Sequence, residues 1–210
     1  MTSYDNLELE NIFIPSKVPS KKLMIILHGR GDSSAGFVGF PPFLALDDMN
    51  YILFDAPFEY MGGNSWYQLP PEQLPGIEYS RTLLTKDLDT LFESDFNADE
   101  SFLFGFSQGS LLTFEFGARY HKVLAGYIAI SGYIYNVPTL LEEMNPDVNA
   151  KNWLCTHGTS DGVLAYDTSK EQIEQLQDSG FDIEFVTYDK DHSIDRDELT
   201  MISEWIKKRS

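Results

Sequence analysis

Short apolar runs alternate with longer amphipathic stretches along this chain. Six of the runs are rich in Ile, Leu, Phe, Tyr or Val: 23–29, 51–57, 101–106, 123–131, 152–158 and 182–189. Several are apolar nearly throughout, which is typical of strands buried on both faces of a parallel sheet. A further segment, 6–16, is expected to add a strand at the edge of the sheet.

Between these runs, apolar residues recur at the spacing of an amphipathic helix. Residues 78–94 place five apolar side chains on one face: Leu83, Leu84, Leu88, Leu91 and Phe92. Other helices are predicted over 110–120, 167–180 and 195–210. Strands alternating with helices predict an α/β fold, with a mostly parallel central sheet and helices on both faces.

One long segment, 56–76, lacks both kinds of pattern and contains four prolines and three glycines. A structureless loop of this length in a compact domain is often a lid or a binding loop. The alternative is a packed surface loop.

Length and composition narrow the class of protein. A chain of 210 residues predicts a single domain over 1–210. The one cysteine, Cys155, excludes an intramolecular disulfide. The N-terminus has no basic, apolar leader, and no apolar run approaches the ~20 residues of a membrane span. We therefore expect a cytoplasmic protein without stable membrane insertion.

The charge is strongly acidic, with 33 Asp and Glu against 15 Lys and Arg and a net charge of −18. Nucleic-acid binding needs clustered Lys and Arg, so we expect no nucleic-acid partner. Attraction to anionic membranes is disfavoured for the same reason. Solubility explains the charge most simply.

The sequence GFSQG at 105–109 fits the G-x-S-x-G pattern of a nucleophile elbow. A serine that attacks a carbonyl must stand clear of the sheet on a sharp strand-to-helix turn. Neighbouring backbone passes closely there, so the residues two before and two after it must be small. Because 101–106 reads as a buried strand and 110–120 as a helix, Ser107 is predicted to be a nucleophile.

A nucleophilic serine needs a base and an acid, which follow it in this chain order as Asp or Glu and then His. Of the three histidines after Ser107, His192 lies between the last predicted strand and the last helix, where a base is expected. His121 reads as a surface residue, and His157 ends a strand just before the candidate acid.

Asp161 is the candidate acid, since it follows the strand 152–158 at the same sheet edge. It would accept the imidazole N–H and fix the tautomer. Asp167, Asp189 and Asp191 are rivals. Asp191 adjoins His192, but adjacent side chains rarely face one another.

An oxyanion formed in this reaction needs two N–H donors. One is expected from Gln108, which follows the nucleophile, and the other from an early βα loop. The loop 28–31 has glycines on both sides of Arg30, so we assign the second donor to the backbone of Arg30.

Other chemistries find no support in the motifs. A dinucleotide loop would need glycine where Ser34 stands, and no P-loop or HExxH motif occurs. Cys155 reads as a buried small hydrophobe. No metal or cofactor is expected.

The segments LHGRGD, SWY, GFSQGS, HGTSDGV and DHS occur in this order. Together they resemble the phospholipase/carboxylesterase family of α/β-hydrolases, which includes acyl-protein thioesterases, from about residue 21 onward. The resemblance implies the α/β-hydrolase fold, with Ser107, Asp161 and His192 as triad and Arg30 and Gln108 as oxyanion donors. It also implies cofactor-free hydrolysis of carboxylic esters, acyl thioesters or lysophospholipids.

Three departures from the family concern mainly the substrate. Ser110 replaces a second glycine, Arg30 replaces an apolar residue, and PPEQLPG follows SWY. The arginine could favour an acidic substrate, or it could be solvated. Candidate lining residues for an acyl groove, which could equally be core, are Phe37, Phe40, Phe43, Trp66, Tyr67 and Leu69.

We therefore expect a serine esterase that acts on short- to medium-chain carboxylic esters through an acyl-enzyme. A thioesterase or lysophospholipase is the alternative within the class. The alternative from another class is a non-catalytic binding protein of the same fold. A homodimer is compatible with the family, but nothing in the sequence establishes one.

Overall fold

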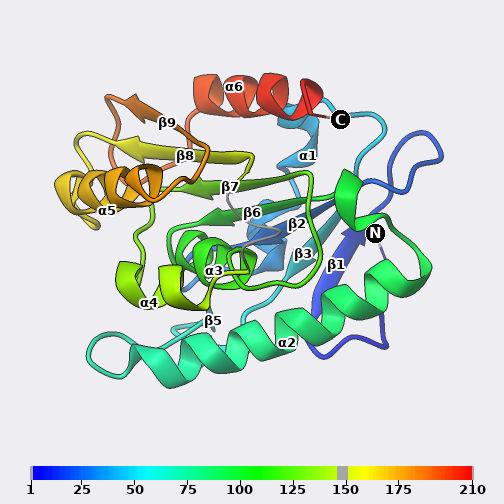
Figure 1. Cartoon of the computed structure of the whole chain (residues 1–210). Helices are drawn as coiled ribbons and strands as arrows, with labels where there is room; N and C mark the ends of the chain where they lie inside the picture. Colours follow the sequence, from blue (N-terminus) through cyan, green and yellow to red (C-terminus); the bar gives the residue numbers. More distant parts are fainter. Residues whose placement is uncertain (1, 146–150, 210) are drawn as a thin grey trace.

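A seven-stranded sheet forms the centre of the protein in the computed structural model, which describes residues 2–145 and 151–209 (Figure 1). Its strands are β1 (Asn11–Ile14), β2 (Leu23–Leu27), β3 (Asn50–Phe54), β6 (Phe102–Phe106), β7 (Gly126–Ile130), β8 (Trp153–Gly158) and β9 (Ile183–Tyr188). Their spatial order is β1-β3-β2-β6-β7-β8-β9. Only β1 runs antiparallel to its neighbour. The mostly parallel sheet and the added edge strand are confirmed.

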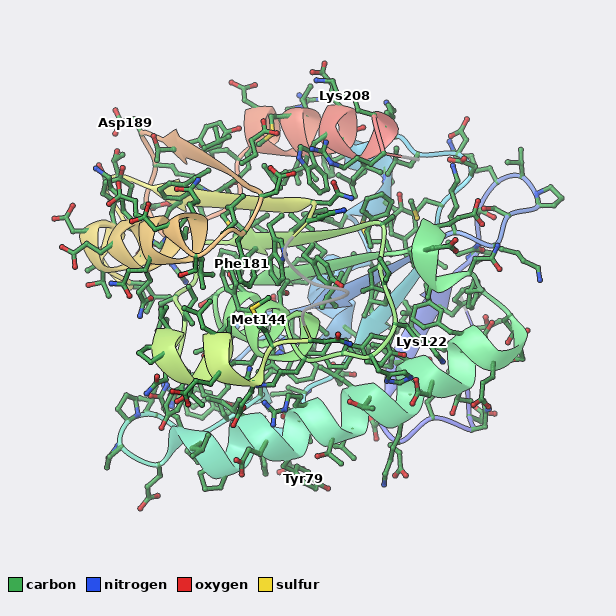
Figure 2. All side chains as sticks on the ribbon, in the orientation of Figure 1. Tyr79, Lys122, Met144, Phe181, Asp189 and Lys208 are labelled. Atoms are coloured by element: carbon green, nitrogen blue, oxygen red, sulfur yellow. The ribbon has the colours of Figure 1, made fainter. Side chains whose placement is uncertain are left out.

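Burial explains the difference between the central strands and the outer ones. Every residue of β2, β3, β7 and β8 is buried, so these strands read as continuous apolar runs. The edge strand β9 mixes buried, half-buried and exposed positions. Since the six parallel strands share one direction, their carboxyl ends meet at one edge of the sheet. Asp189, labelled in Figure 2, follows β9 at that edge.

Helices cover both faces of the sheet (Figure 1). On one face lie α2 (Gln73–Ser94), α3 (Gln108–Gly117), α4 (Val137–Glu143) and α5 (Tyr166–Asp178). On the other lie α1 (Pro41–Leu44), α6 (Arg196–Lys207) and the short 3-10 helix η1 (Ser34–Phe37). A second 3-10 helix, η2 (Ala98–Glu100), precedes β6. Each face has its own hydrophobic core, which confirms the predicted layers.

The prediction of an unstructured segment over 56–76 is wrong. Its first part forms an antiparallel hairpin of β4 (Phe58–Tyr60) and β5 (Gly63–Ser65), and its last four residues begin α2. The hairpin is fastened to the loop after β2, because the N–H of Gly31 donates to the carbonyl of Asn64 at 2.7 Å and the N–H of Asn64 donates to the carbonyl of Asp32 at 2.8 Å. Contacts between such distant residues leave no local pattern in the sequence.

A short helix, α4, was not predicted from the sequence. Its N-cap is Asn136, whose side chain accepts a hydrogen bond from the N–H of Thr139 at 3.0 Å. The predicted helix near 195 begins with a capping box between Asp195 and Glu198. Across the described ranges, no helix is both long enough and apolar enough to cross a membrane.

Candidate active site

Ser107 lies on the turn between β6 and α3, with φ 55° and ψ −113°. Such a backbone conformation is strained for a residue with a side chain. A Cβ on Gly105 would lie 2.1 Å from the carbonyl oxygen of Gly109, and a Cβ on Gly109 would lie 2.1 Å from that of Leu27. The structure therefore gives the glycines the close-packing role predicted from the sequence.

The structure brings Ser107, His192 and Asp161 together in one hydrogen-bonded row. His192 Nε2 lies 2.9 Å from Ser107 Oγ, and His192 Nδ1 lies 2.7 Å from Asp161 Oδ2. With its proton on Nδ1, the imidazole donates to the carboxylate and leaves Nε2 free to accept the hydroxyl proton. No hydrogen bond or ion pair joins His192 to Asp167, Asp189 or Asp191 within the residues that the structure describes.

Asp161 is held as a carboxylate by its surroundings. Burial raises its pKa, but hydrogen bonds from His192 and from the N–H groups of Leu164 and Val163 outweigh that effect, so the pKa is lowered from 3.8. The two backbone donors lie 2.8 Å and 2.9 Å from Oδ1. Asp161 is therefore ionised and rigidly oriented at neutral pH.

A second histidine, His157, lies behind the same carboxylate. Its Nε2 is 3.1 Å from the carbonyl oxygen of Leu164 and 3.4 Å from Asp161 Oδ2. Burial lowers the pKa of His157, so the neutral form is favoured. By contrast, His121 is exposed and pairs with Asp89 on the surface, as expected.

A buried ion pair supports the loop that carries His192. Lys190 Nζ donates to the carbonyl oxygen of Ser193 and to Glu198 Oε2, and both charged side chains are almost completely buried. Glu198 Oε2 also accepts the N–H of Asp195 at 3.1 Å. Sequence reasoning missed this pair, because a lysine and a glutamate on either side of a helix start usually lie in solvent. The pair fixes the loop to the first turn of α6.

The backbone donors predicted for an oxyanion make no hydrogen bond within the described chain. In the ranges 2–145 and 151–209, neither the N–H of Arg30 nor that of Gln108 has an acceptor. Gln108 begins α3, where N–H groups have no partner inside the helix. A Cβ on Gly29 would lie 3.3 Å from Ser107 Cβ, so the loop that contains Arg30 packs against the serine.

Sequence reasoning also missed the role of the Gln108 side chain. Its Oε1 accepts hydrogen bonds from the N–H of Trp66 at 2.9 Å and from Ser65 Oγ at 3.1 Å. Its Nε2 donates to the carbonyl of Tyr67 at 2.9 Å. Gln108 therefore ties the segment 65–67 to the elbow.

The candidate lining residues fall into three groups by burial, and Phe40, which is partly buried and packs against the core on the α6 side, forms the middle one. Trp66 has no exposed surface, and Tyr67 and Phe37 have almost none, so their core interpretation fits better than a role in lining a pocket. Trp66 Nε1 donates to the carbonyl of His28 at 2.9 Å, which further fixes it inside the protein. Leu69 and Phe43 are half exposed.

Two other chemistries, that of a cysteine nucleophile and that of a metal site, find no matching arrangement in the described residues. Cys155 is buried in β8, and burial raises the pKa of its thiol. No group of three or more His, Cys, Asp or Glu side chains is arranged to hold a metal ion in the described chain.

Comparisons with known proteins agree with this geometry. Residues 9–210 match the model of the phospholipase/carboxylesterase family. An acyl-protein thioesterase 1 of Debaryomyces hansenii is 28% identical over 212 residues, which cover 86% of this chain and 88% of that protein. The carboxylesterase SOBER1 of Arabidopsis thaliana is 26% identical over 210 residues, with coverage of 90% and 91%.

Among solved structures, the esterase PE8 matches with a TM-score of 0.87 at 24% identity. The match covers 97% of this chain and 100% of that one. The fold is thus the one predicted from the motifs. The chain belongs to the phospholipase/carboxylesterase family of hydrolases and has the α/β-hydrolase fold.

Proposed function

We propose that this protein hydrolyses short- to medium-chain carboxylic esters through an acyl-enzyme on Ser107. The row of hydrogen bonds from Asp161 through His192 to Ser107 carries the proposal. The chemistry needs no metal or cofactor.

Each step uses a group with a defined position. Ser107 Oγ attacks the ester carbonyl while His192 Nε2 takes the hydroxyl proton, and Asp161 stabilises the imidazolium. The tetrahedral oxyanion accepts hydrogen bonds from the N–H groups of Arg30 and Gln108. His192 then returns the proton to the leaving alcohol. A water molecule, activated by His192, repeats the sequence on the acyl-enzyme and releases the acid.

The burial of the aromatic candidates supports the proposed chain length. A long acyl chain needs a long apolar groove, but Phe37, Trp66 and Tyr67 pack in the interior.

A thioesterase or lysophospholipase uses the same steps with a different leaving group. The relative in Debaryomyces hansenii, an acyl-protein thioesterase, favours the thioesterase version. Relative rates on an ester and a thioester of the same acyl group separate these alternatives. A non-catalytic binding protein would bind an intact ester tightly without turning it over.

Hydrolysis of p-nitrophenyl esters from acetate to dodecanoate tests the proposal. Ser107→Ala should abolish turnover, whereas Ser110→Ala should retain it, since the buried Ser110 hydroxyl lies in the first turn of α3 without a hydrogen-bond partner in the described structure. Equal turnover by Ser107→Ala and the unmodified protein would refute the mechanism. The chain-length optimum would give the size of the acyl site.

The single domain, the cytoplasmic location and the oligomeric state stay predictions. Limited proteolysis, cell fractionation and sedimentation in solution would measure them in turn.

A further inference from the structure

Arg30 belongs to the loop that packs against Ser107, and its side chain has a defined position. Its guanidinium carbon lies 3.9 Å from the centroid of the Tyr60 ring, so the guanidinium stacks on that ring. Tyr60 belongs to the β4–β5 hairpin, which two backbone hydrogen bonds fasten to Gly31 and Asp32, the two residues that follow Arg30. The ring, the hairpin and the loop thus hold the guanidinium together.

Arg30 has no acidic partner in the described chain, although acidic residues outnumber basic ones 33 to 15. Its Nε is buried and lacks an acceptor there. Other cations of the protein do pair with carboxylates: Lys17, Lys22, Arg119 and Lys190 are examples. The guanidinium therefore keeps an unpaired positive charge in the described chain, and a negatively charged ligand would pair with it.

Two carboxylates of this region, one in the loop after β2 and one just after β3, already have other partners. Asp32 Oδ1 accepts the N–H of Ser33 at 2.8 Å. Asp55 accepts the N–H and the hydroxyl of Ser34 at 2.6 Å and 2.9 Å, as well as the side-chain amide of Asn64 at 3.3 Å. Neither acid neutralises the guanidinium.

The position of Arg30 is close to the reacting groups. It follows Gly29, where an added Cβ would lie 3.3 Å from Ser107 Cβ. Burial raises the pKa of Tyr67, and the positive charge of Arg30 opposes that rise. The segment that contains Tyr67 is the one tied to the elbow by Gln108.

We propose that Arg30 binds a carboxylate of the substrate, so that the preferred esters carry an acidic group within a few bonds of the scissile carbonyl. This inference rests on the proposed esterase function and adds the class of substrate to it. The two terminal Nη groups of the guanidinium form a planar fork that matches the two oxygens of a carboxylate. The backbone N–H of the same residue serves the oxyanion, so one residue would contact both charges.

The acidity of the whole protein makes the inference sharply testable. A net charge of −18 repels anionic esters at long range, so a preference for them needs a local cation. Without Arg30, neutral esters should be the better substrates.

Two matched pairs of esters distinguish a carboxylate on the acyl side from one on the alcohol side. The first pair is the mono-p-nitrophenyl ester of hexanedioic acid and p-nitrophenyl heptanoate. The second is para-acetoxybenzoate and para-acetoxyacetophenone. For each pair, the ratio of kcat/KM for the anionic ester to that for the neutral one is measured in the unmodified protein, Arg30→Lys and Arg30→Leu.

We expect the unmodified protein to favour the anionic ester of at least one pair by about tenfold. Arg30→Leu should lose this preference, mainly through a higher KM for the anionic ester. Arg30→Lys should keep part of it, because the charge remains while the fork is lost. Both variants keep the backbone N–H.

The outcomes separate this inference from the proposed function. Hydrolysis that persists in Ser107→Ala would refute the esterase mechanism itself. Hydrolysis that requires Ser107 but shows no anionic preference in either pair would overturn the Arg30 inference alone. A preference that survives in Arg30→Leu would do the same. The ratio in the unmodified protein decides the question even if a variant does not fold.

Discussion

The two sides of Ser107 differ in how completely their polar groups are satisfied. On the acid–base side, the loops after β8 and β9 hold Asp161 with three hydrogen-bond donors and fix Lys190 between a carbonyl and Glu198. On the oxyanion side, the described structure offers no acceptor to the backbone N–H groups of Arg30 and Gln108. One side is complete before substrate binds, whereas the proposed substrate completes the other.

This difference fits the two tasks. Proton transfer needs an imidazole whose orientation is already fixed, and fixed partners provide it. Stabilising a charge that develops only during reaction needs donors that are in place but not yet used. The predictions below perturb each side in turn, in decreasing order of expected effect.

Replacing the acid should have the largest effect. Asp161→Asn removes the charge and disfavours the tautomer that leaves His192 Nε2 free, so kcat for ester hydrolysis should fall by roughly 10³–10⁴-fold. The control is Asp191→Asn, which alters the exposed rival acid next to His192. An equal loss in the control would mean that Asp161 has been assigned the wrong role.

Breaking the buried ion pair between Lys190 and Glu198 should destabilise the acid–base side. Lys190→Met leaves Glu198 buried without its partner, so the free energy of unfolding in urea should fall by about 3–5 kcal/mol. Lys170→Met is the matched control, because its pair with Glu174 is half exposed and should contribute little. The double variant Lys190→Met/Glu198→Leu should recover much of the loss. Similar losses from Lys190→Met and Lys170→Met would contradict the supporting role of Lys190.

An alanine at position 109, in the first turn of α3, should affect the oxyanion side. The added methyl of Gly109→Ala would overlap the carbonyl of Leu27, at the end of the strand that leads to Arg30. We expect a loss of about 1–3 kcal/mol in unfolding free energy, with reduced kcat. Gly39→Ala adds the same methyl where no atom lies within 4 Å. If Gly39→Ala were equally harmful, close packing would not explain the requirement at 109.

The smallest expected effect is a pH dependence of protein stability that arises from His28, which adjoins the loop that contains Arg30. His28 Nδ1 lies 2.6 Å from the carbonyl oxygen of Gly29, and Nε2 accepts the N–H of Ala56 at 3.1 Å, so the ring is neutral. Burial lowers the pKa of His28 from 6.5. Between pH 6.5 and this lowered pKa, the unfolded chain binds a proton that the folded protein excludes, so stability falls as the pH decreases across that interval.

Urea unfolding at several pH values between 7.5 and 5 measures this effect. The loss of stability on acidification should be smaller in His28→Gln than in the unmodified protein. His121→Gln is the control, since its side chain is exposed. The same pH dependence in His28→Gln and the unmodified protein would exclude His28 as the source.

Local patterns predicted the parts of the molecule that depend on neighbouring residues. The buried runs gave the parallel strands, and GFSQG gave the strained turn at Ser107, because sterics act there between residues close in sequence. The chain order of Asp161 and His192 followed from the strands that they end. The structure places Ser107, Asp161 and His192 side by side, as these patterns predicted.

Long-range contacts account for what the sequence pattern missed. Gln108 meets Trp66 across 42 positions, and the hairpin at 58–65 is fixed by the loop near Gly31. No periodic pattern or motif in the sequence indicates either contact. Trp66 and Tyr67 were ambiguous between core and pocket for a similar reason, since aromatic side chains suit both environments.

Labelling with a fluorophosphonate tests the central claim most directly. The reagent modifies a serine only where a base activates it and donors stabilise the product. We predict one equivalent of label per chain by intact mass, located on Ser107 by peptide mapping and much slower to form in His192→Ala. An unlabelled protein, or a label on another serine at the same rate in His192→Ala, would contradict the assignment of Ser107 as the nucleophile.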